Sequence, residues 1–316
     1  MKYEPYDAKV LPRYEGIRSF MRLPVVEEVP AGVDFAVVGV PMDGASTFET
    51  GQRMGPVSIR NASVNCRGYH PELDVEIFSY LQGVDFGDVP MLPGYIEECY
   101  ANTEKKIDKI YQADAIPFCM GGDHAVTLPL LRSAAKKYGK VALVHFDAHY
   151  DNNSSYFGKK YNHATWVYHG VQEGLIVPEH SIQIGMRGSC FITDRKQSID
   201  LGLDTVTAFE MRELGLKEVM HRIQTRVGSH QVFCSFDIDF LDPSCAPGTG
   251  TIEPGGFTSY ETLCLIRCMK EMNLIGMDLV EVLPAMDHGN ITSNLAAYIL
   301  YDFIAMMALK KKRKTL

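Results

Sequence analysis

The stretch "KVALVHFDAHYDNN" at residues 140–153 joins a predicted buried strand to a group of ligand-type side chains. Its apolar part, residues 141–146, is short and continuous, as in a strand that is covered on both faces of a parallel sheet. Asp147, His149 and Asp151 follow at alternate positions, so a continuing strand would point all three to one side. Buried carboxylates are costly unless they are paired or bind a cation. The stretch therefore predicts a metal site at the end of a buried strand.

The rest of the chain repeats this alternation of apolar runs and helical segments. Runs that predict strands lie at residues 35–40, 81–86, 115–120, 141–146, 181–186, 204–209, 231–236 and 274–283, with 81–86 and 204–209 the weakest. Helical periodicity covers residues 127–140, 258–272 and 292–312. The alternation predicts one doubly wound α/β domain over residues 34–316. Residues 1–33 are expected to form an irregular N-terminal arm.

Two more predicted strands end in ligand-type residues. The run at 115–120 leads to His124, and the run at 231–236 leads to Asp237 and Asp239. In a doubly wound sheet, ligands gather at the carboxyl ends of the strands, so we expect the three groups to meet. Together they provide two imidazoles and four carboxylates: His124, Asp147, His149, Asp151, Asp237 and Asp239. These are more ligands than one ordinary zinc site uses. They suit two divalent cations that share carboxylates.

The donor set also bears on the metal and on the chemistry. Oxygen-rich ligation favours manganese, so we expect two Mn²⁺ per chain, although ligand type leaves Ni²⁺, Co²⁺ and Fe²⁺ open. Two such ions would let a water lose its proton near neutral pH, which predicts a metal-activated hydrolase. His145, Asp123 and Asp242 are expected to support the site or form turns instead of binding metal.

Composition limits the partners. The net charge of −8 argues against nucleic acid, which requires a basic face. The eight cysteines contain no CxxC pair, which is typical of a reducing compartment. The first residues form no apolar signal region. The sequence also has no uninterrupted run of 18 apolar residues, the length that a membrane-spanning helix requires. We therefore expect a cytoplasmic protein without a membrane or nucleic-acid partner.

Four long segments resemble the ureohydrolases, the arginase and agmatinase family, and bacterial agmatinases are the best match. They are "GGDHAVTLPLL" (121–131), "VALVHFDAHYD" (141–151), "SFDIDFLDPSCAPGTGTIEPGG" (235–256) and "GMDLVEVLPAMDHGNITSNLAA" (276–297). The resemblance extends over residues 34–307. It implies a three-layer α/β/α fold with a mostly parallel sheet of roughly eight strands, a homotrimer or homohexamer, and two manganese ions on the six ligands. It also implies hydrolysis of a small guanidino substrate to urea and an amine.

The resemblance assigns roles to further residues. Glu281 matches the family position that binds the substrate guanidinium, where a carboxylate can accept paired N–H bonds from a planar cation. His163, in "YNHATW", matches a mobile-loop histidine that relays protons, which suits a side chain that titrates near neutrality. The implied reaction converts agmatine to putrescine and urea, a step of polyamine biosynthesis, with the amine protonated through Asp151 or His163. His169 matches no role and is expected at the surface.

Several candidate substrate contacts depart from the agmatinase pattern. Tyr150 stands where a small threonine is usual, Trp166 adds bulk beside Ala164, and Glu49 stands where a basic residue is common. Asn153 lies near a position that holds the amino-acid end of the substrate in arginases. These differences leave open whether the substrate is agmatine, a guanidino acid such as guanidinobutyrate, arginine or guanidine. A non-catalytic family member is the remaining alternative.

Overall fold

An eight-stranded parallel sheet forms the centre of the protein, in a computed structural model that describes residues 2–315. The strand order is β4-β1-β5-β10-β9-β6-β7-β8, and neighbouring strands run parallel. The strands are β1 (Phe35–Val40), β4 (Gly83–Asp88), β5 (Ile116–Gly121), β6 (Ala142–Phe146), β7 (Ile182–Met186), β8 (Asp204–Thr207), β9 (Gln231–Asp237) and β10 (Asn273–Val280). Each overlaps a predicted run, which confirms the predicted α/β class. A short antiparallel pair, β2 (Tyr69–His70) and β3 (Val75–Glu76), forms a separate sheet.

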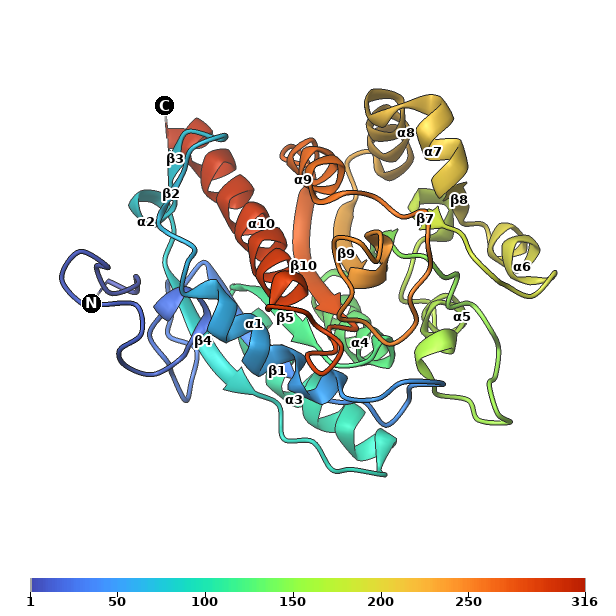
Figure 1. The fold of residues 1–316 in the computed structure, drawn as a ribbon, viewed down its shortest axis with the longest axis horizontal. Helices are drawn as coiled ribbons and strands as arrows, with labels where there is room; N and C mark the ends of the chain where they lie inside the picture. The colour runs from blue at the N-terminus through green and yellow to red at the C-terminus, as the bar shows by residue number, and fades with distance from the viewer. Residues whose placement is uncertain (1, 316) are drawn as a thin grey trace.

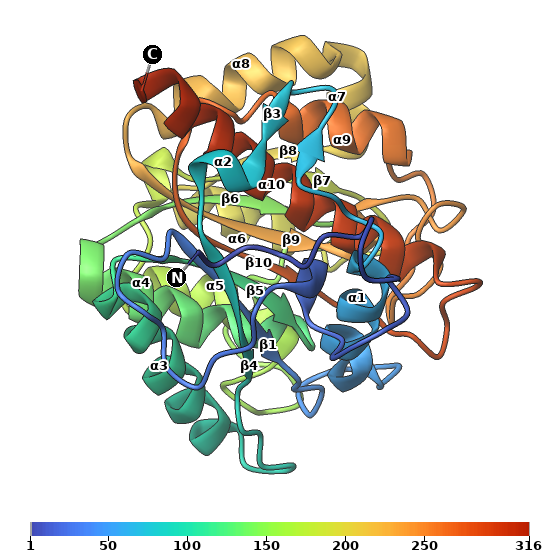
Figure 2. The same ribbon diagram turned by 90° about the vertical axis from the view of Figure 1, so that its left-hand side faces the viewer.

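Helices cover both faces of the sheet and give three layers (Figures 1 and 2). One face carries α1 (Gly55–Ser63), α7 (Ala208–Leu214), α8 (Leu216–Val227), α9 (Ser259–Arg267) and α10 (Ile291–Thr315). The other carries α3 (Ile96–Gln112), α4 (Thr127–Tyr138) and α5 (Trp166–Gln172). Helix α6 (Asp194–Asp200) contacts the edge strand β8, and the short α2 (Ile77–Tyr80) contacts α10. Short 3-10 turns are η1 (Phe20–Arg22), η2 (Gln52–Met54), η3 (His124–Val126), η4 (His163–Thr165), η5 (Pro178–His180) and η6 (Ile238–Phe240).

Local sequence signals set several helix ends. Thr258 Oγ1 accepts the Glu261 N–H at 3.2 Å, and Glu261 Oε2 accepts the Thr258 N–H at 2.8 Å, which forms a capping box before α9. Gly139 follows α4 with a φ of 77°, a left-handed conformation that costs glycine little. These signals therefore place the helix ends where the sequence predicts them.

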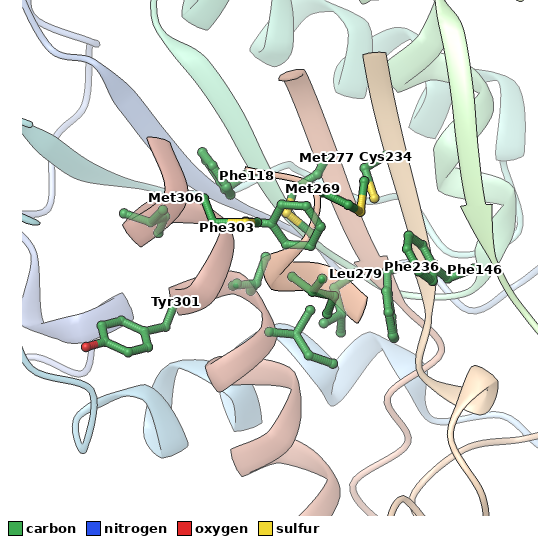
Figure 3. Close-up of a cluster of buried hydrophobic side chains, with 14 of the residues drawn as sticks. Phe118, Phe146, Cys234, Phe236, Met269, Met277, Leu279, Tyr301, Phe303 and Met306 are labelled. Atoms are coloured by element: carbon green, nitrogen blue, oxygen red, sulfur yellow. The ribbon is translucent and has the colours of Figure 1, made fainter. Parts of the chain in front are cut away.

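The largest buried cluster lies between the sheet and α10. Phe118 of β5, Phe236 of β9 and Met277 of β10 belong to the same cluster as Phe303 of α10 (Figure 3). By length and composition α10 could cross a membrane, with a mean hydropathy of 1.3 over its most apolar window. However, 72% of that window is buried inside the protein. The apolar side chains of α10 therefore build the core of the three-layer fold.

The N-terminal residues 2–33 are mostly irregular and are anchored to β4. Phe20 of η1 is fully buried in the core, and Val25 forms a parallel bridge to Asp85 of β4. The buried Asp85 carboxylate accepts the Phe20 N–H at 2.7 Å. It also accepts two N–H bonds from Arg60 of α1, at 2.8 and 2.9 Å. One carboxylate thus joins the arm, a strand and a helix.

We expect Asp85→Asn to destabilise the protein, because the buried Arg60 guanidinium then loses its buried charged partner and keeps only the exposed Asp88. The loss should be about 3 kcal/mol in the free energy of unfolding, measured by urea denaturation with circular dichroism. Asp88→Asn is the matched control, since the Asp88 side chain also pairs with Arg60 but is 46% exposed. The control should lose less than about 1 kcal/mol. Equal losses in the two variants would show that burial of the pair does not matter.

Candidate metal centre and active site

Ligand-type side chains follow four adjacent strands of the sheet. Across the sheet in the order β5, β10, β9 and β6, the strand ends lead to His124, Glu281, Asp237 and Asp147. Because these strands are parallel, their carboxyl ends lie at the same edge of the sheet. The topology thus brings together segments that are far apart in the sequence.

Local turns place the ligands that come directly after these strand ends. β6 ends before Asp147, so the expected continuation of that strand through residues 147–151 is wrong. Instead, Asp147 Oδ1 accepts the His149 N–H at 2.6 Å, and Asp237 Oδ1 accepts the Asp239 N–H at 2.9 Å. Aspartate favours such turns, because its carboxylate satisfies a backbone donor two residues further on. Each aspartate therefore turns the chain so that the next candidate ligand stays at the strand end.

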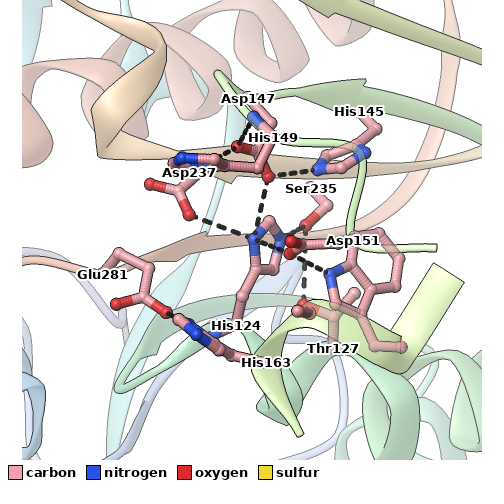
Figure 4. Close-up of polar contacts among 12 residues, drawn as sticks. His124, Thr127, His145, Asp147, His149, Asp151, His163, Ser235, Asp237 and Glu281 are labelled. Carbon is pink, nitrogen blue, oxygen red and sulfur yellow. Dashed lines mark hydrogen bonds and ion pairs between the residues drawn. The ribbon is translucent and has the colours of Figure 1, made fainter. Parts of the chain in front are cut away.

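His124 is the centre of the first group of candidate ligands (Figure 4). Its Nδ1 lies 3.1 Å from a carboxylate oxygen of each of Asp147, Asp151 and Asp237. Its Nε2 lies 2.8 Å from Ser235 Oγ, which donates its hydrogen to Asp278. Since the serine oxygen must then accept, His124 carries its proton on Nε2, and its Nδ1 lone pair faces the three carboxylates.

His149 is the centre of a second group, which Asp147 links to the first. His149 Nδ1 lies 3.0 Å from Asp239 Oδ2 and 3.4 Å from Asp147 Oδ1. The other oxygen of Asp147, Oδ2, faces His124. The two oxygens of one carboxylate therefore belong to two adjacent groups of donors, which is the arrangement of a bridging ligand.

The donor atoms fit divalent cations. His124 Nδ1 is buried and has no hydrogen-bond partner, which is costly for a polar atom unless a cation binds it. Separations of about 3 Å between donors are typical of ligands that bind one ion at about 2.1 Å. Burial and repulsion from Asp239 and Asp147 raise the pKa of Asp237 well above its usual range. A cation between these carboxylates would remove that repulsion, and the six candidate ligands lie in two adjacent groups that share Asp147.

The side chains beneath the ligands hold them in place. His145 Nε2 donates to Asp147 Oδ2 at 2.7 Å, because Gln183 Nε2 donates to its Nδ1 at 3.0 Å. Asp123 accepts the backbone N–H groups of Ala45 and Ala125, and it caps the η3 turn that carries His124. Both residues therefore lie where the sequence analysis expected them, behind the candidate ligands. Asp242 likewise accepts backbone N–H groups in a turn.

Glu281 lies beside the cluster in a strained backbone conformation, with a φ of 64° directly after β10. Its Oε1 accepts the His124 N–H at 2.8 Å and lies 2.9 Å from His163 Nδ1. His163 Nε2 accepts the Thr47 N–H at 3.1 Å, so His163 donates through Nδ1 to Glu281. The two residues predicted to handle the substrate are thus direct partners.

Gln52 is a site residue that the sequence analysis missed. Its side chain is 1% exposed, and its Nε2 donates to Glu281 Oε2 at 2.9 Å and to the Glu49 carbonyl at 3.0 Å. No periodicity marks a glutamine in the η2 turn. The available signal was its position directly after residues 44–51, a loop whose Glu49 already stood out. Gln52 fixes one oxygen of Glu281, so it helps to orient that carboxylate.

A cavity of about 320 Å³ opens beside the cluster. Its walls include the predicted residues Tyr150, Asn153 and His163. Three other predicted substrate contacts do not line it. Glu281 is one of them, since its side chain is buried beside His163. Glu49 is exposed and does not line the cavity. Trp166 is fully buried, and its Nε1 donates to Asp151 Oδ2 at 2.9 Å, so it supports a candidate ligand.

The expectation of a surface position for His169 is wrong. Its side chain is 6% exposed and packs edge-on against Tyr161 and Tyr168, with ring centroids at 5.8 and 5.2 Å. Burial lowers the pKa of His169, which favours the neutral ring. Helix α5 turns this histidine inward, and a lone histidine in the sequence carries no sign of that direction.

Comparisons with known proteins agree with this geometry. A model of the arginase family matches residues 33–306. Guanidinobutyrase from Pseudomonas aeruginosa is 39% identical over 309 residues, which cover 96% of this chain and 97% of that protein. Agmatinase from Proteus mirabilis is 38% identical over 296 residues, covering 93% and 94%. The solved structure of proclavaminate amidino hydrolase from Streptomyces clavuligerus matches with a TM-score of 0.89 and 37% identity, covering 95% of this chain and 99% of that chain. The chain therefore belongs to the arginase family.

Proposed function

We propose that this arginase-family hydrolase cleaves agmatine to putrescine and urea with two bound divalent cations. One observation carries the proposal. The Asp147 carboxylate belongs to two adjacent groups of metal-type donors, and these groups lie directly beside Glu281. His124, Asp151 and Asp237 would complete one cation site with Asp147. Two bound cations would supply an activated water for attack on the guanidino carbon and would stabilise the charge that develops.

The side chains around the cation sites bind the substrate and transfer protons. Glu281 accepts N–H bonds from the substrate guanidinium, a planar cation that suits a carboxylate. The guanidinium competes with His163 for Glu281 Oε1, because both donate to the same oxygen. His163 is then released to give its proton to the leaving amine, while Asp151 offers a second route for that proton. Gln52 keeps Glu281 in its orientation during the exchange.

The cavity wall supports an amine at the far end of the substrate. Apart from the candidate metal ligands, Asp194 is the acidic side chain that lines the cavity within residues 2–315. It is 6% exposed, and its Oδ1 has no hydrogen-bond partner. A buried unpaired carboxylate oxygen favours a ligand that carries N–H donors, such as the ammonium of agmatine. We therefore assign tail recognition to Asp194 in place of Glu49.

A guanidino acid is the second candidate substrate. A relative named guanidinobutyrase is as similar to this chain as a relative named agmatinase, so similarity does not separate the two substrates. The free carboxylate of Asp194 would repel an anionic tail, which favours agmatine over guanidinobutyrate.

The wider setting follows from the same reasoning. We propose manganese as the metal, because four of the six ligands are carboxylates. The eight cysteines are all free thiols in the structure, which supports a cytoplasmic location. We further propose a homotrimer or homohexamer that acts in polyamine biosynthesis.

Metal analysis tests the binuclear site. Protein saturated with Mn²⁺ should hold about two ions per chain by plasma mass spectrometry. Asp147→Asn should weaken binding at both positions, because both groups share this carboxylate, whereas Asp239→Asn should spare the His124 group. Both variants should lose urea release. Full activity in excess chelator would contradict the proposal.

Substitution of Glu281 tests guanidinium docking. Glu281→Gln should keep the metal content but lower kcat/KM roughly 30- to 150-fold, because a charge-assisted contact contributes about 2 to 3 kcal/mol. Urea release under single-substrate kinetics provides the measurement, and metal content is the control. An unchanged kcat/KM would place Glu281 outside the substrate site.

Substrate preference tests the role of Asp194. Asp194→Asn should lower kcat/KM for agmatine about tenfold and leave guanidinobutyrate no worse, because the ammonium loses its charged partner. Glu49→Gln is the control and should change neither value, since Glu49 is exposed outside the cavity. If kcat/KM of the wild-type protein is about tenfold higher for guanidinobutyrate than for agmatine, agmatine is not the substrate, and the hydrolase assignment still stands.

A further inference from the structure

Arg187 is a basic residue on the wall of the cavity, one position after the end of β7. Its guanidinium donates to five backbone carbonyl oxygens, those of Gly185, Asp239, Phe240, Leu241 and Glu253. An arginine has five N–H groups, and each of them has an acceptor here. No carboxylate lies within ion-pair distance of Arg187 in residues 2–315. Its donors are therefore already used by the backbone, and none is left for a substrate carboxylate.

Four of the five carbonyls that Arg187 binds belong to two segments that hold the His149 group of candidate ligands. Nη2 contacts the carbonyls of Asp239 and Leu241, at 2.5 and 3.1 Å, in and after the η6 turn. Both Nη2 and Nε contact the carbonyl of Glu253, at 2.9 and 3.3 Å. Asp239 is a ligand in that group, and Glu253 Oε1 lies 3.8 Å from His149 Nε2. One side chain thus ties both segments to the end of β7.

The neighbouring glycine shows how closely these segments fit. Gly188 has a φ of 73°, and a Cβ there would lie 2.1 Å from the carboxyl group of Glu253. A side chain at this position would therefore displace the carboxyl group of Glu253. Residues 187 and 188 thus contact Glu253 in two ways. The Arg187 guanidinium binds the Glu253 carbonyl, and the Gly188 backbone lies against the Glu253 side chain.

We propose that Arg187 is a positioning residue for the second cation of the binuclear site. This inference rests on the proposed function, because it presumes that two cations bind. Arg187 holds the η6 turn and the Glu253 segment so that Asp239 and His149 converge. It makes no contact with the His124 group, so its effect is confined to the cation held by His149, Asp239 and Asp147.

Mn²⁺ titration of purified full-length protein by calorimetry and electron paramagnetic resonance tests this role. Arg187→Met should weaken one of two Mn²⁺ sites about tenfold or more and leave the other unchanged. Arg187→Lys should recover part of the lost affinity, because an ammonium can still donate to two or three of the carbonyls. Arg212→Met is the matched control, since Arg212 donates to the carbonyls of Gly255 and Gly256 and does not contact Asp239 or Glu253.

The outcomes separate this inference from the proposed function. Two Mn²⁺ sites of wild-type affinity in Arg187→Met would overturn it. Equal weakening of both sites, or an equal effect of Arg212→Met, would show a general loss of structure and would also overturn it. A raised KM for guanidinobutyrate with both Mn²⁺ sites intact would make Arg187 a substrate anchor instead. If the wild-type protein binds two Mn²⁺ but releases no urea from any guanidino compound, the proposed function fails while the metal titration still decides the role of Arg187.

Discussion

The constraint on which the site depends is the mutual repulsion of carboxylates that are buried at one edge of the sheet. Asp147, Asp237 and Asp239 lie together with little access to water, and the pKa of Asp237 rises accordingly. Burying such groups is unfavourable unless a cation is shared among them. The fold therefore keeps this edge in a state that favours metal binding, and the Asp147 carboxylate belongs to both groups of donors.

The protein holds these carboxylates by giving nearly every supporting group a defined partner. Ser235 and Asp278 fix the tautomer of His124, and His145 holds one oxygen of Asp147. The indole of Trp166 does the same for Asp151. Hydrogen bonds of this kind orient metal ligands and raise their basicity, so they matter for affinity as much as the ligands do. On the other side of the cluster, Arg187 plays a corresponding part through backbone carbonyls.

The substrate side of the site has a different character. Glu281 is held by Gln52, by the His124 backbone and by His163, so its position is set before a substrate arrives. Such preorganisation lowers the cost of orienting the guanidinium. Another part of the cavity wall contains the loop residues Tyr150 and Asn153 and also Asp194, the first residue of α6, which would offer a partner for an ammonium. The Glu281 carboxylate is thus preorganised by its hydrogen bonds, whereas the proposed specificity depends on other residues of the cavity wall.

The sequence alone determined the fold class and singled out the candidate metal ligands. Apolar runs mark the strands because a parallel sheet must be buried on both faces, and His124, Asp147 and Asp237 stand out because polar residues follow those runs directly. Contacts between distant segments were decided only by the tertiary structure. Gln52, Trp166 and Arg187 touch the site through partners that no local pattern reveals, and His169 is turned inward by the packing of α5. Periodicity reports which face of an element is buried, whereas the partner of a polar atom depends on which segments the folded chain brings within hydrogen-bond distance.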